Sequence, residues 1–267
     1  MQAININDKK FNINPEGYES FWLQVEGQNW EKETYRIFNE NIDKDTLVID
    51  IGAWIGPTVL YSAQIAKKCI AFEPDPIAFP RLQENLNLNN TETWSQNLII
   101  YQKAVSSTSG HISLGNRHGG GDSMSSVLFS DSAINWIVEA VTLEDIINEH
   151  RKENEKIFLK IDIEGGEYEL IPAIKDYLQD KRITTFISLH PQFLRRSLKK
   201  SVGKNLGVPR FIKTRLEFLR TYKSIIGSLP ENKRVTINGK EHKTYAWFLL
   251  YSFLTLRTPT DLLIECV

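Results

Sequence analysis

Apolar residues recur along this chain with two alternating periods. Short apolar runs with strand character are residues 47–51, 69–73, 98–105, 157–163, 184–189 and 262–267. Between them, apolar residues recur at helical spacing over residues 30–41, 57–66, 76–89, 141–149, 170–178 and 245–256. Strands that alternate with helices predict an α/β fold in which helices cover both faces of a largely parallel sheet.

The two ends of the chain and one internal stretch depart from this alternation. Apolar and polar residues alternate over residues 3–14, which predicts a β-hairpin. We therefore expect an N-terminal extension of hairpin and helices over residues 1–45, followed by one main domain over residues 46–267. Residues 110–126, rich in glycine and serine, predict a mobile loop or hairpin outside the core. The chain ends inside its last predicted strand, which favours one domain of a longer polypeptide.

The composition disfavours several classes of protein. The sequence is 41% apolar and 24% charged with a net charge of −1, so we do not expect a basic surface that binds nucleic acid. Cys69 and Cys266 are too few for a disulfide framework and lack metal-site spacing, so we expect reduced, buried thiols. The N-terminus lacks a signal-peptide core, and no apolar run reaches the ~20 residues of a membrane span. These features predict a cytoplasmic protein without a membrane span.

One basic segment follows residue 191. Residues 195–223 hold ten basic side chains against one acid, Glu217. The apolar residues that predict a buried helix face in this segment are Ile212, Leu216, Leu219 and Ile226. We expect a helical segment over residues 192–230 on the substrate side, with a basic outer face. A solvated helix face is the favoured interpretation, and attraction of an anionic substrate is the alternative.

The stretch LVIDIGAWIG, residues 47–56, combines a buried strand with a glycine turn. Asp50 lies within the apolar run, Gly52 and Gly56 follow it, and Pro57 stands in the first turn of the next helix. Strand, glycine turn and helix form the nucleotide-site half of a βαβ unit. Glu73 ends the second strand near the ~20-residue spacing that is typical of an acid binding a nucleotide ribose.

Four polar residues fall at the carboxyl ends of predicted strands, namely Asp50, Glu73, Asp162 and His190. Ligands bind at this edge of doubly wound sheets, so we expect one site there. A dinucleotide such as NAD is disfavoured, because the third glycine is absent and Asp50 would repel a phosphate. Asp50 would instead attract a cation such as the α-amino group of S-adenosylmethionine, while Glu73 accepts hydrogen bonds from the ribose hydroxyls.

Five ordered blocks carry a resemblance to a known family: IDIGAWIG, AFEPDPIAFPRLQENLNLN, KAVSSTSGHISL, VTLEDI and LKIDIEGGEYEL. Over about residues 30–191 the sequence resembles the FkbM-type S-adenosylmethionine-dependent methyltransferases, most of which methylate hydroxyls of sugars, glycolipids or natural products. The resemblance implies a Rossmann-like class I methyltransferase fold with a mostly parallel seven-stranded sheet. The family usually has Asn where this sequence has Trp54, so we expect Trp54 to alter the shape of the methionine pocket. Gly166, in the last of the five blocks, fits the small residue that the family has at that position.

The candidate cofactor-binding residues are Asp50, Gly52, Trp54, Gly56, Glu73 and Asp162. The candidate catalytic residues are His190, as the base that takes an acceptor proton, and Asp162, which orients it or the substrate. Several of these residues also have a purely structural explanation. Asp50 could cap the following helix, the glycines could serve the turn alone, and His190 could be held by core hydrogen bonds.

Charged neighbours of these candidates leave more alternatives open. Lys160, in the same strand as Asp162, predicts a structural partner for a nearby acid. Glu164 and Glu167 fit a site role and a helix N-terminus equally well, because the macrodipole favours acids there. Asp162 with His190 could hold a divalent cation, but two ligands are too few to predict one, so metal dependence stays unknown. The histidines predicted to lie on the surface are His111, His118, His150 and His242.

The sequence therefore predicts an S-adenosylmethionine-dependent O-methyltransferase that acts on a hydroxyl of a sugar, glycoconjugate or natural product. The alternative is a carboxylate O-methyltransferase acting on a peptide or another anionic natural product, which needs no base and would use the basic segment to attract its substrate. A more distant alternative is a non-catalytic module that binds anions or RNA. A small-molecule, saccharide or peptide substrate is expected, and the oligomeric state stays open.

Overall fold

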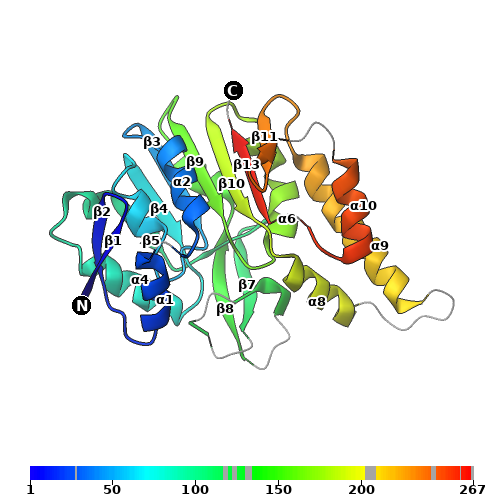
Figure 1. Cartoon of the computed structure of the whole chain (residues 1–267), viewed down its shortest axis with the longest axis horizontal. Helices are drawn as coiled ribbons and strands as arrows, with labels where there is room; N and C mark the ends of the chain where they lie inside the picture. The colour runs from blue at the N-terminus through cyan, green and yellow to red at the C-terminus, as the bar shows by residue number, and fades with distance from the viewer. Residues whose placement is uncertain are drawn as a thin grey trace.

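The apolar strands of the sequence form one large sheet at the centre of the molecule (Figure 1). The structure is a computed structural model and describes residues 1–27, 29–116, 120–121, 125–129, 134–201, 209–241, 245–258 and 260–265. The large sheet has the strand order β12-β11-β13-β10-β9-β3-β4-β5. Its parallel strands are β3 (Thr46–Ile51), β4 (Lys68–Phe72), β5 (Leu98–Tyr101), β9 (Lys156–Ile161) and β10 (Ile183–Ser188).

Three further strands complete the large sheet beyond β10. They are β11 (Arg234–Ile237), β12 (Lys240–Glu241) and β13 (Asp261–Glu265), and β13 pairs antiparallel with both β10 and β11. The mostly parallel sheet confirms the predicted α/β fold. The described sheet has eight strands rather than seven, because the turn at Asn238 and Gly239 folds the two-residue β12 back onto β11. Both turn residues have positive φ, as tight hairpin turns require.

Alternate residues of the central strands face opposite layers of the core. In β3, Leu47, Ile49 and Ile51 belong to one apolar cluster, whereas Val48 belongs to the other. The first layer contains α5 (Leu143–His150), α6 (Glu167–Ala173), α7 (Lys175–Gln179) and α9 (Arg210–Ser228). The opposite layer contains β1 (Gln2–Ile6), β2 (Lys9–Ile13), α1 (Glu19–Glu26), α2 (Lys32–Asn41), α3 (Val59–Ser62) and α4 (Ala78–Asn87). Helices therefore cover both faces of the sheet, as predicted.

The N-terminal extension has the predicted hairpin and helices, and it packs on the same core as the sheet. Trp22 of α1 and Phe38 of α2 are fully buried. The backbone N–H of Asn12 donates to Asn89 Oδ1 at 2.8 Å, which ties β2 to the end of α4. The division of the chain at residue 45 stays a prediction, since the extension shares one apolar cluster with the main domain.

A second, three-stranded sheet corrects one sequence prediction and adds a strand that was not predicted. Its order is β6-β8-β7, with β6 (Ala104–Val105), β7 (Gly110–Asn116) and β8 (Ile134–Val141). The run predicted as one strand over residues 98–105 divides into β5, at the edge of the large sheet, and β6 in the small one. The stretch over residues 110–126, expected as a mobile loop or hairpin, begins as β7, which pairs antiparallel with β8 as a hairpin strand would. The strand β8 was not predicted, although six of its eight residues are apolar.

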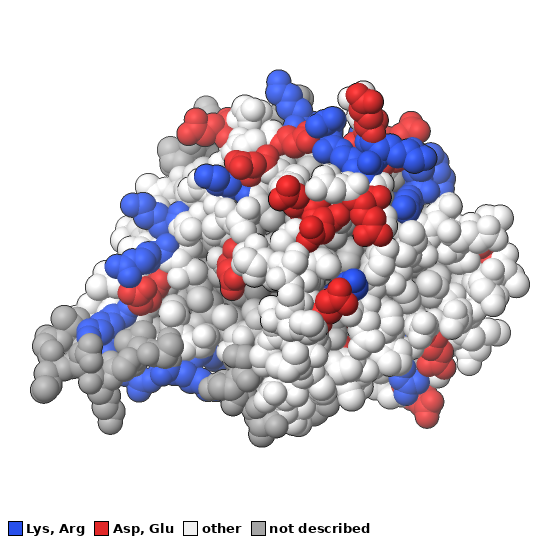
Figure 2. Space-filling view, turned by 180° about the vertical axis from the view of Figure 1, so that it is seen from behind, with Lys and Arg blue, Asp and Glu red and all other residues white. Residues whose placement is uncertain are grey.

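Several predicted helices differ from those observed. The helix expected over residues 57–66 is the single turn α3, and that over 170–178 divides at Ile174 into α6 and α7, two residues after Pro172. The basic segment forms α8 (Pro191–Ser201) and α9, and α9 packs against α6 and α10 (Ala246–Thr255). The buried face of α9 consists of Thr214, Phe218, Tyr222, Ile225 and Ser228 rather than the predicted apolar set. Lys and Arg side chains gather on this side of the molecule (Figure 2).

The remaining expectations concern cysteines, histidines and membrane spans. Cys69 is buried and reduced, as predicted, and Cys266 lies outside the described residues together with His118 and His242. His111 is exposed as expected, whereas the side chain of His150 is only 7% exposed because it packs beside Tyr101. Within the described part of the chain, the structure contains no helix with the length and apolarity to cross a bilayer.

Candidate active site

Two glycine turns meet at the carboxyl edge of the large sheet. The first turn, residues 52–57, follows β3, and the second turn, residues 162–167, follows β9. Gly52 has a φ of +89°, and a Cβ there would lie 1.8 Å from the backbone oxygen of Asp162. Only glycine permits both this conformation and this contact. The two turns are therefore packed directly against each other.

Beneath the first turn, Asp50 forms an ion pair with Lys160 inside the sheet. The two residues are register partners on β3 and β9, and Lys160 Nζ donates to Asp50 Oδ1 at 2.9 Å. Thr58 Oγ1 donates to Asp50 Oδ2 at 2.9 Å, and Lys160 Nζ also donates to the carbonyl of Gly52 at 3.1 Å. Burial raises the pKa of Asp50, and Lys160 opposes this by stabilising the carboxylate. Lys160 is thus the structural partner that the sequence predicted.

Glu73 lies at the end of β4, next to the first turn. Its Oε2 accepts from the backbone N–H of Trp54 at 2.8 Å, and its Oε1 accepts from that of Asp75 at 2.8 Å. Burial raises the pKa of Glu73 to about 7, although the two backbone donors favour the ionised form. The sheet and the turn therefore hold one carboxylate in a fixed orientation.

Trp54 joins the first turn to the N-terminal extension. It has a φ of +48°, which Asn adopts more readily than a bulky residue. Its indole N–H donates to the carbonyl of Gly121 at 2.9 Å, and the hydroxyl of Tyr18 donates to the same carbonyl at 2.6 Å. Its ring packs edge-on against Phe21 of α1, with centroids 4.5 Å apart. The tryptophan therefore fixes α1 over the turn.

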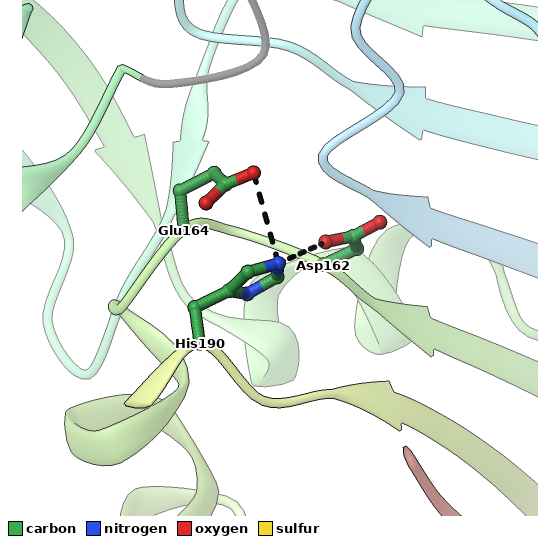
Figure 3. Close-up of side chains that lie close together, drawn as sticks. All are labelled: Asp162, Glu164 and His190. Atoms are coloured by element: carbon green, nitrogen blue, oxygen red, sulfur yellow. Dashed lines mark ion pairs between the residues drawn. The ribbon is translucent and has the colours of Figure 1, made fainter. Parts of the chain in front are cut away.

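The second turn gathers carboxylates around His190, which follows β10 (Figure 3). His190 Nδ1 lies 2.7 Å from Oε1 of Glu167, a fully buried residue whose Oε2 also accepts from the backbone N–H of Gly165 at 2.7 Å. His190 Nε2 lies 3.5 Å from Asp162 Oδ1 and 3.7 Å from Glu164 Oε1. Burial alone would lower the pKa of His190, but these carboxylates raise it to about 10.

A cavity of about 660 Å³ lies between the two turns. Its walls come from both turns, from the N-terminal extension and from the small sheet; the lining includes Phe21, Trp30, Glu31, Gly52, Trp54, Glu73, Val105, Ser106, Leu114, Asp162, Glu164, Glu169 and His190. Asp50 and Gly56 lie behind this wall and do not line it. A Cβ on Gly56 would lie 2.9 Å from Leu82 Cδ1, so its role in the fold is close packing against α4.

Glu31 is a cavity residue that the sequence did not indicate. It precedes α2 with a φ of +44°, and its Oε2 accepts from Thr34 Oγ1 at 2.9 Å. Burial raises the pKa of Glu31 to about 7, and the nearby carboxylate of Asp162 adds to that rise. An acid just before a helix is explained by the helix itself, so its sequence gave no signal of a cavity residue.

The family model for the methyltransferase FkbM domain matches residues 50–206, more than half of the chain. The chain belongs to the FkbM methyltransferase family. The resemblance of its five sequence blocks to this family is confirmed. The match begins at Asp50 and includes both turns, Glu73 and His190. The FkbM domain thus supplies most of the cavity wall, whereas Phe21, Trp30 and Glu31 come from the extension before it.

Three solved structures of low sequence identity are similar to this chain. An FkbM methyltransferase from Methylobacillus flagellatus KT has 14% identity and a TM-score of 0.46, over 91% of this chain and 53% of that one. This chain therefore spans about half the length of that protein. A proposed methyltransferase from Streptococcus mutans in complex with SAH has 12% identity and a TM-score of 0.44, over 87% and 94% of the two chains. An rRNA methylase from Streptococcus thermophilus has 13% identity and a TM-score of 0.40, over 87% and 92%. No curated protein matches the sequence significantly.

Proposed function

We propose that this FkbM methyltransferase transfers the methyl group of S-adenosylmethionine to a hydroxyl oxygen of a sugar, glycoconjugate or natural product. The observation that carries the proposal is the division of one cavity into two halves. Glu73 and the first turn form one half, and the carboxylates and histidine around the second turn form the other. The first half suits a nucleoside with an amino-acid tail, and the second suits an uncharged acceptor rich in hydroxyls.

The first turn and Glu73 bind the cofactor in this proposal. Glu73 accepts hydrogen bonds from the ribose hydroxyls, in the orientation set by the backbone N–H groups of Trp54 and Asp75. Gly52 lets the methionine part approach the backbone, and Trp54 forms the adjoining wall. Gly56 supports the same turn by its packing against α4.

The α-ammonium of the methionine part needs a carboxylate, and Glu31 fits that role better than Asp50. Asp50 is paired with Lys160 and lies behind the wall, whereas Glu31 lines the cavity with Gly52 and Trp54. Asp50 acts indirectly. It holds Lys160 against the carbonyl of Gly52 and so fixes the first turn. The N-terminal extension therefore completes the cofactor site.

Asp162 and His190 act on the acceptor. In the transfer step a lone pair of the acceptor oxygen forms the bond to the methyl carbon, and the carbon–sulfur bond breaks with its electron pair left on sulfur. The acceptor's proton passes to the Asp162 carboxylate. His190, with a pKa of about 10, keeps its own proton at neutral pH and positions Asp162 and the acceptor. The protein contributes alignment and exclusion of water, since charge is dispersed rather than created in this transition state.

The charges on the cavity wall favour a hydroxyl over a carboxylate acceptor. Asp162, Glu164 and Glu169 face the acceptor half, and an anionic acceptor would be repelled by them. The two lysines on the wall are already paired, Lys160 with Asp50 and Lys103 with Glu139. Among its described residues, the basic segment over residues 192–230 contributes nothing to the lining. Carboxylates accept hydrogen bonds from neutral hydroxyls, as a saccharide would offer.

Transfer of a labelled methyl group tests this proposal. The protein is incubated with methyl-labelled S-adenosylmethionine and three acceptor pools, namely neutral saccharides and glycoconjugates, peptides with free carboxylates, and RNA. We expect label in the first pool, in a form that resists mild base because it is an ether. A base-labile product in the peptide pool would identify a carboxylate acceptor, and label confined to RNA would overturn the proposed substrate class.

Two variants test the assigned residues in the same assay. Asp162→Ala and His190→Ala should each lower turnover by roughly 100-fold, in the range of general acid–base catalysis. Their affinity for S-adenosylhomocysteine should change little, which a calorimetric titration measures. Undiminished turnover in both variants would contradict the assignment of the acceptor half.

A further inference from the structure

Three side chains at the second turn direct ligand atoms toward one point. They are Asp162, Glu164 and His190, and one ligand atom from each lies within 4.8 Å of the other two (Figure 3). His190 Nε2 is 3.5 Å from Asp162 Oδ1 and 3.7 Å from Glu164 Oε1. Two atoms that bind one cation at about 2.1 Å each can be at most about 4.2 Å apart. Both His190 pairs meet this limit, and the ligand oxygens of Asp162 and Glu164 lie within 4.8 Å of each other, so rotation of the side chains alone brings the three atoms to one cation.

Glu167 prepares the histidine for such a role. In the tautomer with the hydrogen on Nδ1, His190 donates to Glu167 Oε1 at 2.7 Å. This leaves the lone pair of Nε2 directed at Asp162 and Glu164 whenever the ring is neutral. A carboxylate that fixes the far nitrogen of a histidine is the usual outer-shell partner of a metal-bound imidazole. Glu167 is fully buried and is held by the backbone N–H of Gly165, so the ring orientation is fixed.

The charges around His190 also call for a cation. Asp162, Glu164 and Glu167 surround the ring, whereas the nearest fixed cation, Lys160, makes its short contact with Asp50 at 2.9 Å and lies 3.7 Å from Asp162. A divalent cation held by Nε2 and the two carboxylates would offset this charge.

We infer that Asp162, Glu164 and His190 bind one divalent cation at the acceptor half of the cavity, with Glu167 as the positioning residue for His190. The donor set of one imidazole nitrogen and two carboxylate oxygens suits a cation that accepts both atom types, such as Mn²⁺ or Zn²⁺, better than Ca²⁺, which takes oxygen ligands. The inference rests on the proposed function and deepens it, because it gives the acceptor half a cation that would hold the acceptor oxygen beside Asp162 and His190. A hydroxyl that reached the cation would be held and polarised there.

Titration with Mn²⁺ alone tests the inference without any acceptor. The protein is treated with a chelator and dialysed, and free Mn²⁺ is followed by its electron paramagnetic resonance signal. We expect one Mn²⁺ bound per chain. Glu164→Gln and His190→Gln should each weaken the affinity on the order of 100-fold, and Glu167→Gln by roughly 10-fold or more, as an outer-shell change does. The matched control is Glu169→Gln, a cavity carboxylate outside the group, which should leave the affinity within about twofold.

The outcomes separate this inference from the proposed function. Binding of S-adenosylhomocysteine without any Mn²⁺ site would overturn the inference and leave the methyltransferase proposal intact. Mn²⁺ binding that is equally strong in Glu164→Gln, His190→Gln and the wild type would overturn it too, because the ion would then be elsewhere. Thermal unfolding shows whether each variant is folded. Mn²⁺ should raise the midpoint temperature of unfolding of the wild type and of Glu169→Gln but not that of Glu164→Gln.

Discussion

The first turn and the second turn each follow a buried strand, and each holds one non-glycine residue in the left-handed region, Trp54 at a φ of +48° and Glu164 at +52°. The carboxylates at the two turns have different partners. At the first turn, Asp50 is paired with Lys160, and Glu73 accepts two backbone N–H groups. At the second turn, Asp162, Glu164 and Glu167 converge on a single histidine.

Protein groups therefore compensate the charges in the first half of the cavity. In the second half, the carboxylates leave a net negative charge that the described protein groups do not balance. Compensated charges hold the first turn in a fixed form. The negative surplus at the second turn is costly unless a proton, a cation or a substrate offsets it. Under the proposed function, similar backbones serve cofactor binding in one turn and chemistry in the other, and three variants test the two turns.

Gly52→Ala should have the largest effect, because it forces the two turns apart. Alanine at a φ of +89° is strained, and its Cβ would overlap the backbone oxygen of Asp162 at 1.8 Å. Backbone strain and overpacking together should lower the free energy of unfolding by about 2–6 kcal/mol, as measured by urea denaturation. Gly17→Ala is the matched control, since Gly17 has a φ of +83° and no atom within 4 Å of a Cβ. An equal loss in both variants would contradict the contact between the turns.

Lys160→Met tests the compensation beneath the first turn. Removal of the ammonium leaves Asp50 buried and uncompensated, which should lower the free energy of unfolding by about 3–5 kcal/mol. Lys156→Met is the control on the same strand, because its partner Asp43 is 53% exposed and such pairs contribute about 0–1 kcal/mol. The double variant Asp50→Asn, Lys160→Met should recover part of the loss. If it is no more stable than Lys160→Met, the uncompensated charge is not the cause.

The sequence predicts that the polar residues at the strand ends meet at one edge of the sheet, because the carboxyl ends of parallel strands lie together. Glu73, Asp162 and His190 could therefore be assigned to one site from their positions after apolar runs. The Asp50–Lys160 pair needs the register of β3 against β9, which strand patterns do not contain. Asp50 consequently seemed free to meet a ligand, although it lies behind the wall.

Two further features depend on tertiary contacts that no local pattern encodes. Glu31 reaches the cavity through the packing of the N-terminal extension, in which Phe21 of α1 contacts both Trp54 and Trp30. The small sheet forms part of the wall, but β8 is half exposed and β6 has only two residues. The two residues of β6 are too few to show a periodicity, and the apolar residues of β8 do not alternate strictly. Remote packing, rather than local propensity, therefore completes both walls of the cavity.

Glu73→Gln should have the smallest effect, confined to ligand binding and its pH dependence. The probe is 5′-methylthioadenosine, which has the ribose but no amino-acid part, so Glu31 does not contribute. Because the pKa of Glu73 is about 7, the carboxylate that accepts from the ribose is ionised above this pH and protonated below it. Calorimetric affinity of the wild type should therefore be roughly tenfold weaker at pH 6 than at pH 8.

The variant removes this dependence in a way that a general loss of folding would not. The amide that replaces the carboxylate in Glu73→Gln cannot ionise, so the affinity of the variant should be the same at pH 6 and pH 8 and about tenfold below that of the wild type at pH 8. The pH dependence of folding stability has the opposite sign to that of the ligand affinity. A raised pKa means that the folded protein holds the proton more tightly than the unfolded chain, so the contribution of Glu73 to stability falls as pH rises from about 4.5 to about 7. Affinity that rises with pH while stability falls would assign both effects to one buried carboxylate, and a pH dependence that persists in Glu73→Gln would refute that assignment.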